Sequence, residues 1–208
     1  MGGAGGIGNT QPAMPRWLPN RVAPNDTVFV YFSGHGAPNP KNGKAYLVPF
    51  DGDPSFVEQT GYSLDRLYDR LAGLPAQEVV VVLDACFSGA GGRSVIAEGL
   101  RPMMLSVENP VLAKSNVVAL VASSGGQVSS TYKHQGHGLF TYYFLKGLQG
   151  NADQNHDGRI DIRELFKYLA PEVEQTARRE FNNEQTPQLL GSPEMLSRGV
   201  VLVGSGNR

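Results

Sequence analysis

One cysteine and one histidine, each placed just after an apolar run, are the residues of this chain best suited to chemistry. Cys86 is the only cysteine among 208 residues and lies three positions beyond the run Val79–Leu83. His35 lies two positions beyond a second run, Thr27–Ser33. A thiolate attacks carbonyl carbon well, and an imidazole titrates in the range needed to carry a proton to a leaving amine. The two residue types together predict nucleophilic catalysis at a carbonyl group, provided that the fold brings them into one cleft.

The two apolar runs are predicted to be strands that hold these residues at one edge of a sheet. Short β-branched runs that end in turn residues are typical of strands buried on both faces of a parallel sheet. The carboxyl ends of such strands meet at the edge where α/β proteins usually bind ligands. We expect Thr27–Ser33 to end in a loop at Gly34–Gly36, and further strands at Ala45–Val48 and Asn116–Ala122. Arg198–Val203 is expected to be a closing edge strand.

Helices are predicted between these strands. Ser63–Leu71 has an apolar face, a capping serine and a glycine at position 73 that can end it. Leu139–Leu148 is also expected to be helical, as is Ile162–Phe181, with a kink or restart at Pro171. Strands that alternate with helices indicate an α/β fold with a mainly parallel sheet.

Length and composition indicate one domain behind a flexible N-terminal segment. Residues 1–25 are rich in Gly, Pro and Asn and show no periodicity, so we interpret them as a flexible lead-in to a domain over 26–208. Within that domain, residues 90–115 are expected to be a mobile connection. A net charge of −1 gives no electrostatic reason to expect nucleic acid or a membrane as partner. No apolar run is long enough to span a bilayer, so a soluble protein, cytoplasmic by default, is expected.

The sequence around both residues resembles the caspase-like cysteine peptidases, specifically the metacaspase and bacterial orthocaspase branch. The resemblance lies in Tyr31–Gly36 (YFSGHG) and Asp84–Gly89 (DACFSG), and the interval of 86 − 35 = 51 residues is close to that of caspases. It extends from about Asp26 to about Gln188, with ASS at 122–124 and GLFT at 138–141 in the family's later positions. It implies a caspase-like sandwich: an α/β fold with a mainly parallel central sheet flanked by helices.

The resemblance also implies roles for particular residues. Cys86 would be the nucleophile and His35 the general acid and base of a catalytic dyad, while the backbone N–H groups of Gly36 and Cys86 would form the oxyanion hole. Such a donor typically lowers the barrier by about 3 kcal/mol. Asp84 and Ser33 match positions of the family's substrate pocket. A carboxylate at position 84 would pair with Arg or Lys before the scissile bond of a protein or peptide substrate.

Maturation by self-cleavage is a further expectation from the family. Chains of this family are often cut in the connection after the cysteine strand. Here that connection contains Arg93, Arg101 and Lys114, which match the expected specificity.

A second motif, in an acidic segment, has the pattern of an EF-hand calcium loop. Ca²⁺ prefers six to eight oxygen ligands, and the pattern supplies them at fixed positions. Gly158 would permit the sharp turn of the loop, and Ile160 would point into the core. No second loop of this kind occurs in the sequence, so modest affinity is expected, and no organic cofactor is implied. The expected ligands are Asp153, Asn155, Asp157, the carbonyl group of Arg159, Asp161 and Glu164.

One departure from the family leaves a second interpretation open. Relatives begin with a further segment that carries the first strands of the sheet and part of the pocket. Three explanations are open: the chain is a fragment, a second chain completes the sheet, or the protein is a reduced homologue. In each case the strand Thr27–Ser33 would have an unpaired edge prone to association. The alternative to a peptidase is therefore a catalytically silent, caspase-like, calcium-binding interaction module, or an incomplete fragment. The presence of Cys86, His35 and Asp84 together favours the enzyme.

Overall fold

The computed structural model describes residues 17–39, 41–87, 114–124 and 126–204. The predictions for residues 1–16 and for most of the connection at 90–115 lie outside these ranges. The described part of the lead-in contains a 3₁₀ turn, η1 (Leu18–Asn20), and both Leu18 and Val22 pack against the core. Among the described residues, no helix has the length and apolar character needed to cross a membrane.

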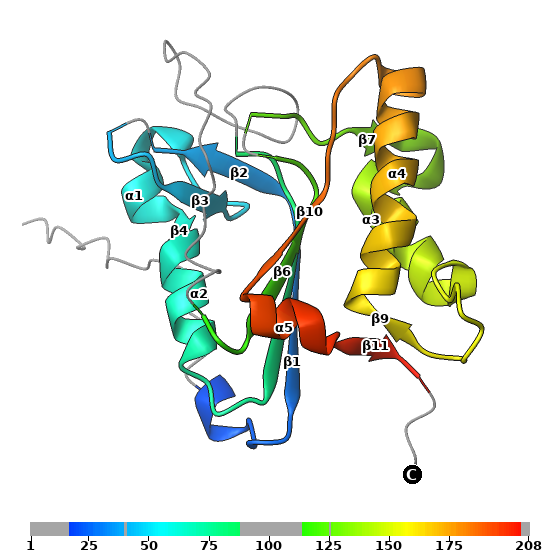
Figure 1. Ribbon diagram of the computed structural model, residues 1–208. Helices are drawn as coiled ribbons and strands as arrows, with labels where there is room; N and C mark the ends of the chain where they lie inside the picture. Colours follow the sequence, from blue (N-terminus) through cyan, green and yellow to red (C-terminus); the bar gives the residue numbers. More distant parts are fainter. Residues whose placement is uncertain (1–16, 40, 88–113, 125, 205–208) are drawn as a thin grey trace, which may run out of the picture.

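A four-stranded sheet with the order β1-β5-β6-β10 forms the centre of the fold (Figure 1). The strands β1 (Thr27–Ser33), β5 (Glu78–Asp84) and β6 (Val117–Val121) are parallel, as the buried apolar runs predict. The fourth strand, β10 (Gln188–Gly191), is antiparallel to β6. All residues of β6 are buried, which explains its uninterrupted apolar sequence.

A smaller antiparallel sheet with the order β2-β3-β4 continues from the end of β1. It consists of β2 (His35–Pro38), β3 (Ala45–Val48) and β4 (Tyr62–Ser63). The prediction of a strand at Ala45–Val48 is confirmed. The prediction of a loop at Gly34–Gly36 is wrong for its last two residues, because His35 begins β2 and pairs with Val48. Short polar and glycine-containing segments such as this one carry too weak a strand signal to be recognised without their partner.

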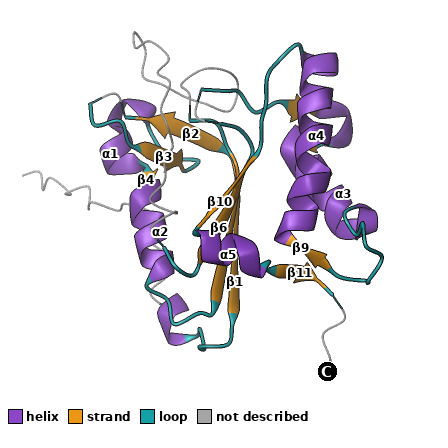
Figure 2. Cartoon of the chain, in the orientation of Figure 1, coloured by secondary structure: helices purple, strands orange, loops and turns teal. Residues whose placement is uncertain are grey.

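Helices cover both faces of the central sheet (Figure 2). On one face, α2 (Leu64–Ala72) packs against alternate residues of β5, including Val79 and Val81. The opposite face, which includes Val80 and Val82, is covered by α3 (Leu139–Lys146) and α4 (Ile162–Phe181). The alternation follows from the two-residue period of a strand.

Local sequence signals account for the ends of the helices. Ser63 caps α2 by accepting from the Arg66 N–H, and the cap at its other end is Gly73. The helix predicted at Leu139–Leu148 ends as α3 at residue 146 and continues as a π-helical turn, η4 (Gly147–Asn151). The predicted restart at Pro171 is wrong, because α4 runs as a single helix through this residue, while the predicted kink stays a prediction. Leu169 and Val173 are completely buried on either side of it, so packing holds the helix together.

The C-terminal strand lies away from the central sheet. The prediction that Arg198–Val203 closes the sheet is wrong: residues 193–198 form the helix α5 (Pro193–Arg198), and β11 (Val201–Val203) pairs with β9 (Ile160–Asp161). The strand at this edge of the central sheet, next to β6, is β10. The remaining short elements are η2 (Pro54–Phe56), α1 (Val57–Thr60), β7 (Thr131–Tyr132), η3 (Lys133–Gln135) and β8 (His137–Gly138).

Candidate active site

The parallel register of β1 and β5 places the histidine and the cysteine at one edge of the sheet. Ser33, the last residue of β1, is paired with Asp84, the last residue of β5. The pairing continues one step further, because the N–H of Gly34 donates to the Asp84 carbonyl oxygen at 3.2 Å. His35 and Cys86 follow directly on their strands. The sequence prediction that both lie at the carboxyl edge agrees with this arrangement.

A close contact between main chains draws the two segments together beyond the strand ends. A Cβ atom built on Gly36 would collide with the Cys86 carbonyl oxygen and the Phe87 ring. Gly36 is buried, whereas His35 beside it is exposed to solvent. Only a residue without a side chain fits at position 36. The YFSGHG and DACFSG segments therefore lie in direct contact at this glycine.

Cys86 is completely buried, and its sulfur lies against the main chain of Ser129. The N–H of Ser129 donates to Sγ, with the two atoms 2.6 Å apart, and the thiol faces the Ser129 carbonyl oxygen at 3.9 Å. A substrate therefore reaches the sulfur only if Sγ turns away from Ser129 or the covering groups move.

The Asp84 carboxylate is also fully buried and accepts two hydroxyl hydrogen bonds. Ser129 Oγ donates to Oδ1 at 2.8 Å, and Thr141 Oγ1 donates to Oδ2 at 2.5 Å. Tyr31 Oη lies 2.7 Å from Thr141 Oγ1. Because β5 alternates its side chains, Asp84 projects toward α3, the same side as Val80 and Val82.

The sequence left several residues of this site unassigned. Ser129, Thr141 and Gln185 are buried around Asp84 and Cys86, and Gln185 Nε2 donates to the Ala122 carbonyl oxygen at 3.1 Å. Thr141 belongs to the GLFT block noticed in the sequence, but nothing in that block indicated its partner. Ser33 has the expected position beside Asp84 and is exposed.

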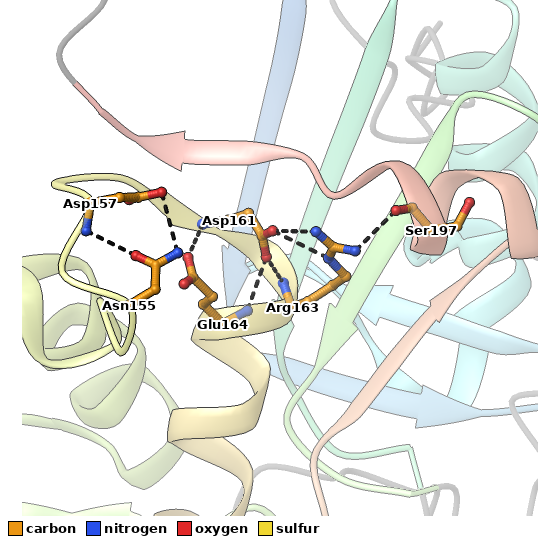
Figure 3. Close-up of polar contacts among 6 residues, drawn as sticks. All are labelled: Asn155, Asp157, Asp161, Arg163, Glu164 and Ser197. Carbon is orange, nitrogen blue, oxygen red and sulfur yellow. Dashed lines mark hydrogen bonds and ion pairs between the residues drawn. The ribbon is translucent and has the colours of Figure 1, made fainter.

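The acidic segment forms a turn between η4 and α4 whose polar contacts are shown in Figure 3. Gly158 has φ of +75°, which suits the sharp turn expected there, and Ile160 is 2% exposed in the core. Asp153 accepts backbone hydrogen bonds from Asp157 at 3.2 Å and Gly158 at 3.0 Å. Asn155 Oδ1 also accepts from the Asp157 N–H, at 2.9 Å.

Other expected calcium ligands take part in the start of α4. Asp161 and Glu164 form a capping box, in which each side chain accepts from the backbone N–H of the other. Arg163 donates to the Asp161 carboxylate through two nitrogens, at 2.7 and 3.2 Å, and to the Ser197 carbonyl oxygen (Figure 3). Among the described residues, no three acidic, imidazole or thiol groups converge on a point that would hold a metal ion. The donor chemistry fits Ca²⁺, and Glu164 Oε2 also accepts from the Asp161 N–H in the capping box.

The charge environment of Asp161 favours its ionised form. Partial burial alone raises the pKa of Asp161, but hydrogen bonds from the Arg163 side chain and from the N–H groups of Glu164 and Arg163 outweigh it. The pKa of Asp161 is therefore below its usual value. The capping carboxylate is charged throughout the neutral range.

The described structure is thus an α/β sheet with a cysteine and a histidine just beyond the carboxyl ends of two neighbouring strands. Comparison with protein families shows which family has this arrangement. The chain belongs to the caspase family, whose model, described as Caspase domain, matches residues 11–195. All four strands of the central sheet and the helices α2, α3 and α4 lie within this matched region.

Among solved structures, the chain is similar to caspase-1 from Spodoptera frugiperda. The two are 14% identical, and the similarity covers 80% of this chain and 60% of that chain, with a TM-score of 0.45. This chain thus spans less than two thirds of the length of that structure. Comparison with curated protein sequences finds no match.

Proposed function

We propose that the protein is a cysteine endopeptidase that uses Cys86 and His35 as a catalytic dyad. The contact of Gly36 with the Cys86 carbonyl oxygen carries this proposal, since it fixes both reactive residues at one edge of the sheet. Membership of the caspase family supports the same reaction class. The alternative, a catalytically silent interaction module, has no need of this close fit between the two segments.

In the proposed reaction, the sulfur of Cys86 attacks the carbonyl carbon of the scissile bond. His35 takes the thiol proton and returns it to the leaving amine, and water then hydrolyses the thioester. The N–H groups of Gly36 and Cys86 would bind the oxyanion. Because Sγ is buried against Ser129, either the groups that cover it move or Sγ turns outward before attack. The conformation described here is then a resting state.

Peptide hydrolysis by the purified chain tests the dyad directly. Replacing Cys86→Ala or His35→Ala should lower kcat/KM on the order of 10³-fold or more, because nucleophile and base act as a unit. Lys167→Ala, at an exposed position of α4 outside both the cysteine site and the acidic turn, is the control and should leave the rate unchanged. Absence of labelling by an Arg-directed, cysteine-reactive probe would instead favour the silent module.

We further propose that cleavage follows Arg or Lys, with Asp84 and Ser33 in the first substrate pocket. Asp84 would provide the negative charge, and the pairing of Ser33 with Asp84 puts both residues at the same strand ends. The burial of Asp84 beneath Thr141 and Ser129 means that a basic side chain reaches it only after local movement.

Citrulline is a neutral analogue of arginine, so comparing the two substrates measures how much the positive charge contributes to recognition. Substrates with Arg, Lys, citrulline and Asp before the scissile bond are compared at equal concentration. We expect Arg and Lys to exceed citrulline by at least about tenfold, and Asp84→Asn to remove most of that preference. A preference for Asp before the scissile bond would overturn the assignment.

Self-cleavage in the connection after β5 follows from the same specificity. Arg93 and Arg101 lie outside the described residues, whereas Lys114 is described and forms an ion pair with Asp69 at 2.7 Å. Intact mass should show cuts after these basic residues in the native chain and none in the Cys86→Ala variant. Identical fragments from both chains would assign the cuts to a contaminant.

We also propose that the acidic turn binds Ca²⁺ through the oxygens of Asp153, Asn155, Asp157, Asp161 and Glu164 and the Arg159 carbonyl group. Two features of the turn support this proposal: Gly158 has a positive φ, and Ile160, two positions later, is buried. Ile160 pairs with β11, as the corresponding residue of a paired loop would with its neighbour. The bound ion would then stabilise the fold and adjust the activity.

Thermal unfolding with and without calcium tests this site. At 100 times Kd the ion adds about 2.7 kcal/mol, which raises Tm by about 5–10 °C in a domain of this size. Glu164→Gln keeps an acceptor for the capping box but removes a bidentate charged ligand, so it should lose most of this rise. Glu184→Gln, at an exposed position outside the turn, should retain it. An unchanged Tm of the native chain with Ca²⁺ or chelator argues against the site.

We propose a second chain as partner at the open edge of β1. In the described part of the chain, β1 pairs with a strand on one side alone, β5. Phe29 and Tyr31 are 49% and 43% exposed there. An edge strand of apolar and aromatic residues without charge favours association.

A further inference from the structure

The mechanism proposed above leaves unexplained a buried hydrogen-bond network beneath Cys86. It links the ends of β1 and β5, the first turn of α3, the Ser129 loop and the segment before β10. Its members are Tyr31, Asp84, Ser129, Ser130, Thr141 and Gln185. Most of these side chains are buried, and buried polar groups are kept where their partners are fixed.

The Asp84 carboxylate fixes the direction of each bond in this network. Since the carboxylate only accepts, the hydroxyl protons of Ser129 and Thr141 point at it. Thr141 Oγ1 then receives the Tyr31 hydroxyl proton at 2.7 Å, and Ser129 Oγ receives Gln185 Nε2 at 3.4 Å. The Ser129 side chain is thereby held between a carboxylate and an amide.

Gln185 fixes the same loop from the other side. Its Oε1 accepts from the Ser130 N–H at 2.8 Å, and its Nε2 donates to the Ala122 carbonyl oxygen at 3.1 Å. Gln185 is 1% exposed, so solvent does not compete for these bonds. The loop between β6 and β7 is therefore attached at two consecutive residues, Ser129 and Ser130.

The main chain of this anchored loop meets the sulfur of Cys86. The N–H of Ser129 donates to Sγ, and its carbonyl oxygen faces the thiol at 3.9 Å. A hydrogen bond donated to sulfur favours the thiolate, the form that attacks carbonyl carbon. We propose that Ser129 is a positioning residue for the Cys86 thiol, and that Asp84 holds it in place through the Ser129 hydroxyl. This inference rests on the proposed cysteine peptidase function and gives Asp84 a second role beside substrate recognition.

The pH dependence of Cys86 alkylation measures this effect without any substrate. Cys86 is the only cysteine of the chain, so iodoacetamide uptake by mass reports on it alone. Burial slows the reaction at every pH, whereas the midpoint of the rate profile reports the thiol pKa. Titratable groups at this edge include His35 on β2, Asp84 on β5 and Tyr31 on β1. All three are unchanged in the variants used.

Ser129→Ala should raise the alkylation midpoint by roughly 0.5–1 pH unit, because the loop loses its attachment to Asp84 and the N–H loosens from Sγ. Ser129→Thr restores a hydroxyl and should return the midpoint to within about 0.2 unit of the native value. Ser130→Ala is the matched control. Its hydroxyl accepts from Asn183 at 3.2 Å, while the backbone bond to Gln185 is retained.

Thr141→Val provides a second variant that does not touch the loop. It removes one donor from Asp84, so it should shift the midpoint in the same direction by a smaller amount. A native midpoint in Ser129→Ala, or an equal shift in Ser130→Ala, overturns the proposal. If Ser129→Ala does not fold, a native midpoint in Thr141→Val overturns it. Failure of the chain to cleave any peptide counts against the peptidase and leaves the alkylation result intact.

Discussion

At the scale of single residues, the close fit at Gly36 is the feature on which the proposed chemistry depends most. The main chain at position 36 lies against the Cys86 carbonyl oxygen and the Phe87 ring. Backbone cannot yield as a flexible side chain does, so even one methyl group forces the segments apart. We expect such a change to lower the stability of the fold and to alter the distance between Cys86 and His35.

Gly36→Ala should lower the free energy of unfolding by about 1–3 kcal/mol, the usual cost of overpacking. Gly73→Ala is the matched control, since a Cβ there meets its nearest atom, the Asp69 carbonyl oxygen, at 3.5 Å. Urea unfolding of both variants checks the stability. Residual kcat/KM under folded conditions should fall for the change at Gly36 alone, and equal behaviour of the two variants would contradict this account.

The sequence identified the reactive residue types but not how they are held. Cys86, His35 and Asp84 stand out because two apolar runs end in unusual residues. The burial of Cys86 and Asp84, and the contacts of Asp84 with Ser129 and Thr141, depend on residues 45 and 57 positions away in the chain. Contacts between residues so far apart in the chain leave no pattern in the sequence around either residue. They appear only when the register of the sheet and the docking of α3 are known.

At the scale of elements, α4 shows how a terminus links the acidic turn to the C-terminal segment. Asp161 caps the helix, and Arg163 joins Asp161 to the Ser197 carbonyl oxygen at the end of α5 (Figure 3). The Ile162 N–H donates to the Val200 carbonyl oxygen at 2.8 Å, beside the β9–β11 pair. These hydrogen bonds connect the start of α4, at the end of the acidic turn, to the C-terminal segment.

Removing the cap should destabilise the fold in a pH-dependent way. Asp161→Ala should cost about 1 kcal/mol at pH 7, the usual value for a lost N-cap. Because the pKa of Asp161 is lowered by folding, its contribution is fully present above the unfolded pKa of about 3.9 and is lost as pH falls through the folded value. Urea unfolding at pH 7 and pH 2.5 measures this.

The difference in the free energy of unfolding between the native chain and Asp161→Ala should be smaller at pH 2.5 than at pH 7. Asp161→Asn keeps a good capping residue that does not titrate, so it should lose less stability at pH 7 than Asp161→Ala does. A native–alanine difference that is the same at both pH values would show that the carboxylate charge has no part in the cap.

Prediction of the elements succeeded where the pattern was long or capped. The strands β1, β3 and β6 and the helices α2 and α4 follow from apolar periodicity and from capping residues. β10 was missed because four residues, Gln188–Gly191, show no alternation, and β11 was assigned to the wrong sheet because strand pairing is not a local property. A restart expected at Pro171 does not occur, because burial of Leu169 and Val173 keeps α4 continuous through the proline.

At the scale of the whole molecule, the strand order makes β1 an edge strand of the central sheet within the described residues. The strand reads TVFVYFS, with no charged residue or proline to discourage pairing. Phe29 and Tyr31 stack against Phe144 of α3, with ring centroids 6.4 and 6.5 Å apart, yet each keeps nearly half of its surface exposed. Backbone groups and aromatic surface are thus presented together along one side of the molecule.

A charge placed on this edge should therefore reduce association. Phe29→Lys introduces a residue that natural edge strands use against pairing, and the apparent mass at tens of micromolar should fall toward 22.4 kDa. Phe50→Lys is the matched control, because Phe50 is fully exposed at a turn away from β1. Sedimentation velocity of the three chains at several concentrations gives the measurement. If the native chain is already monomeric, or both variants dissociate alike, then β1 is not the surface through which a second chain binds.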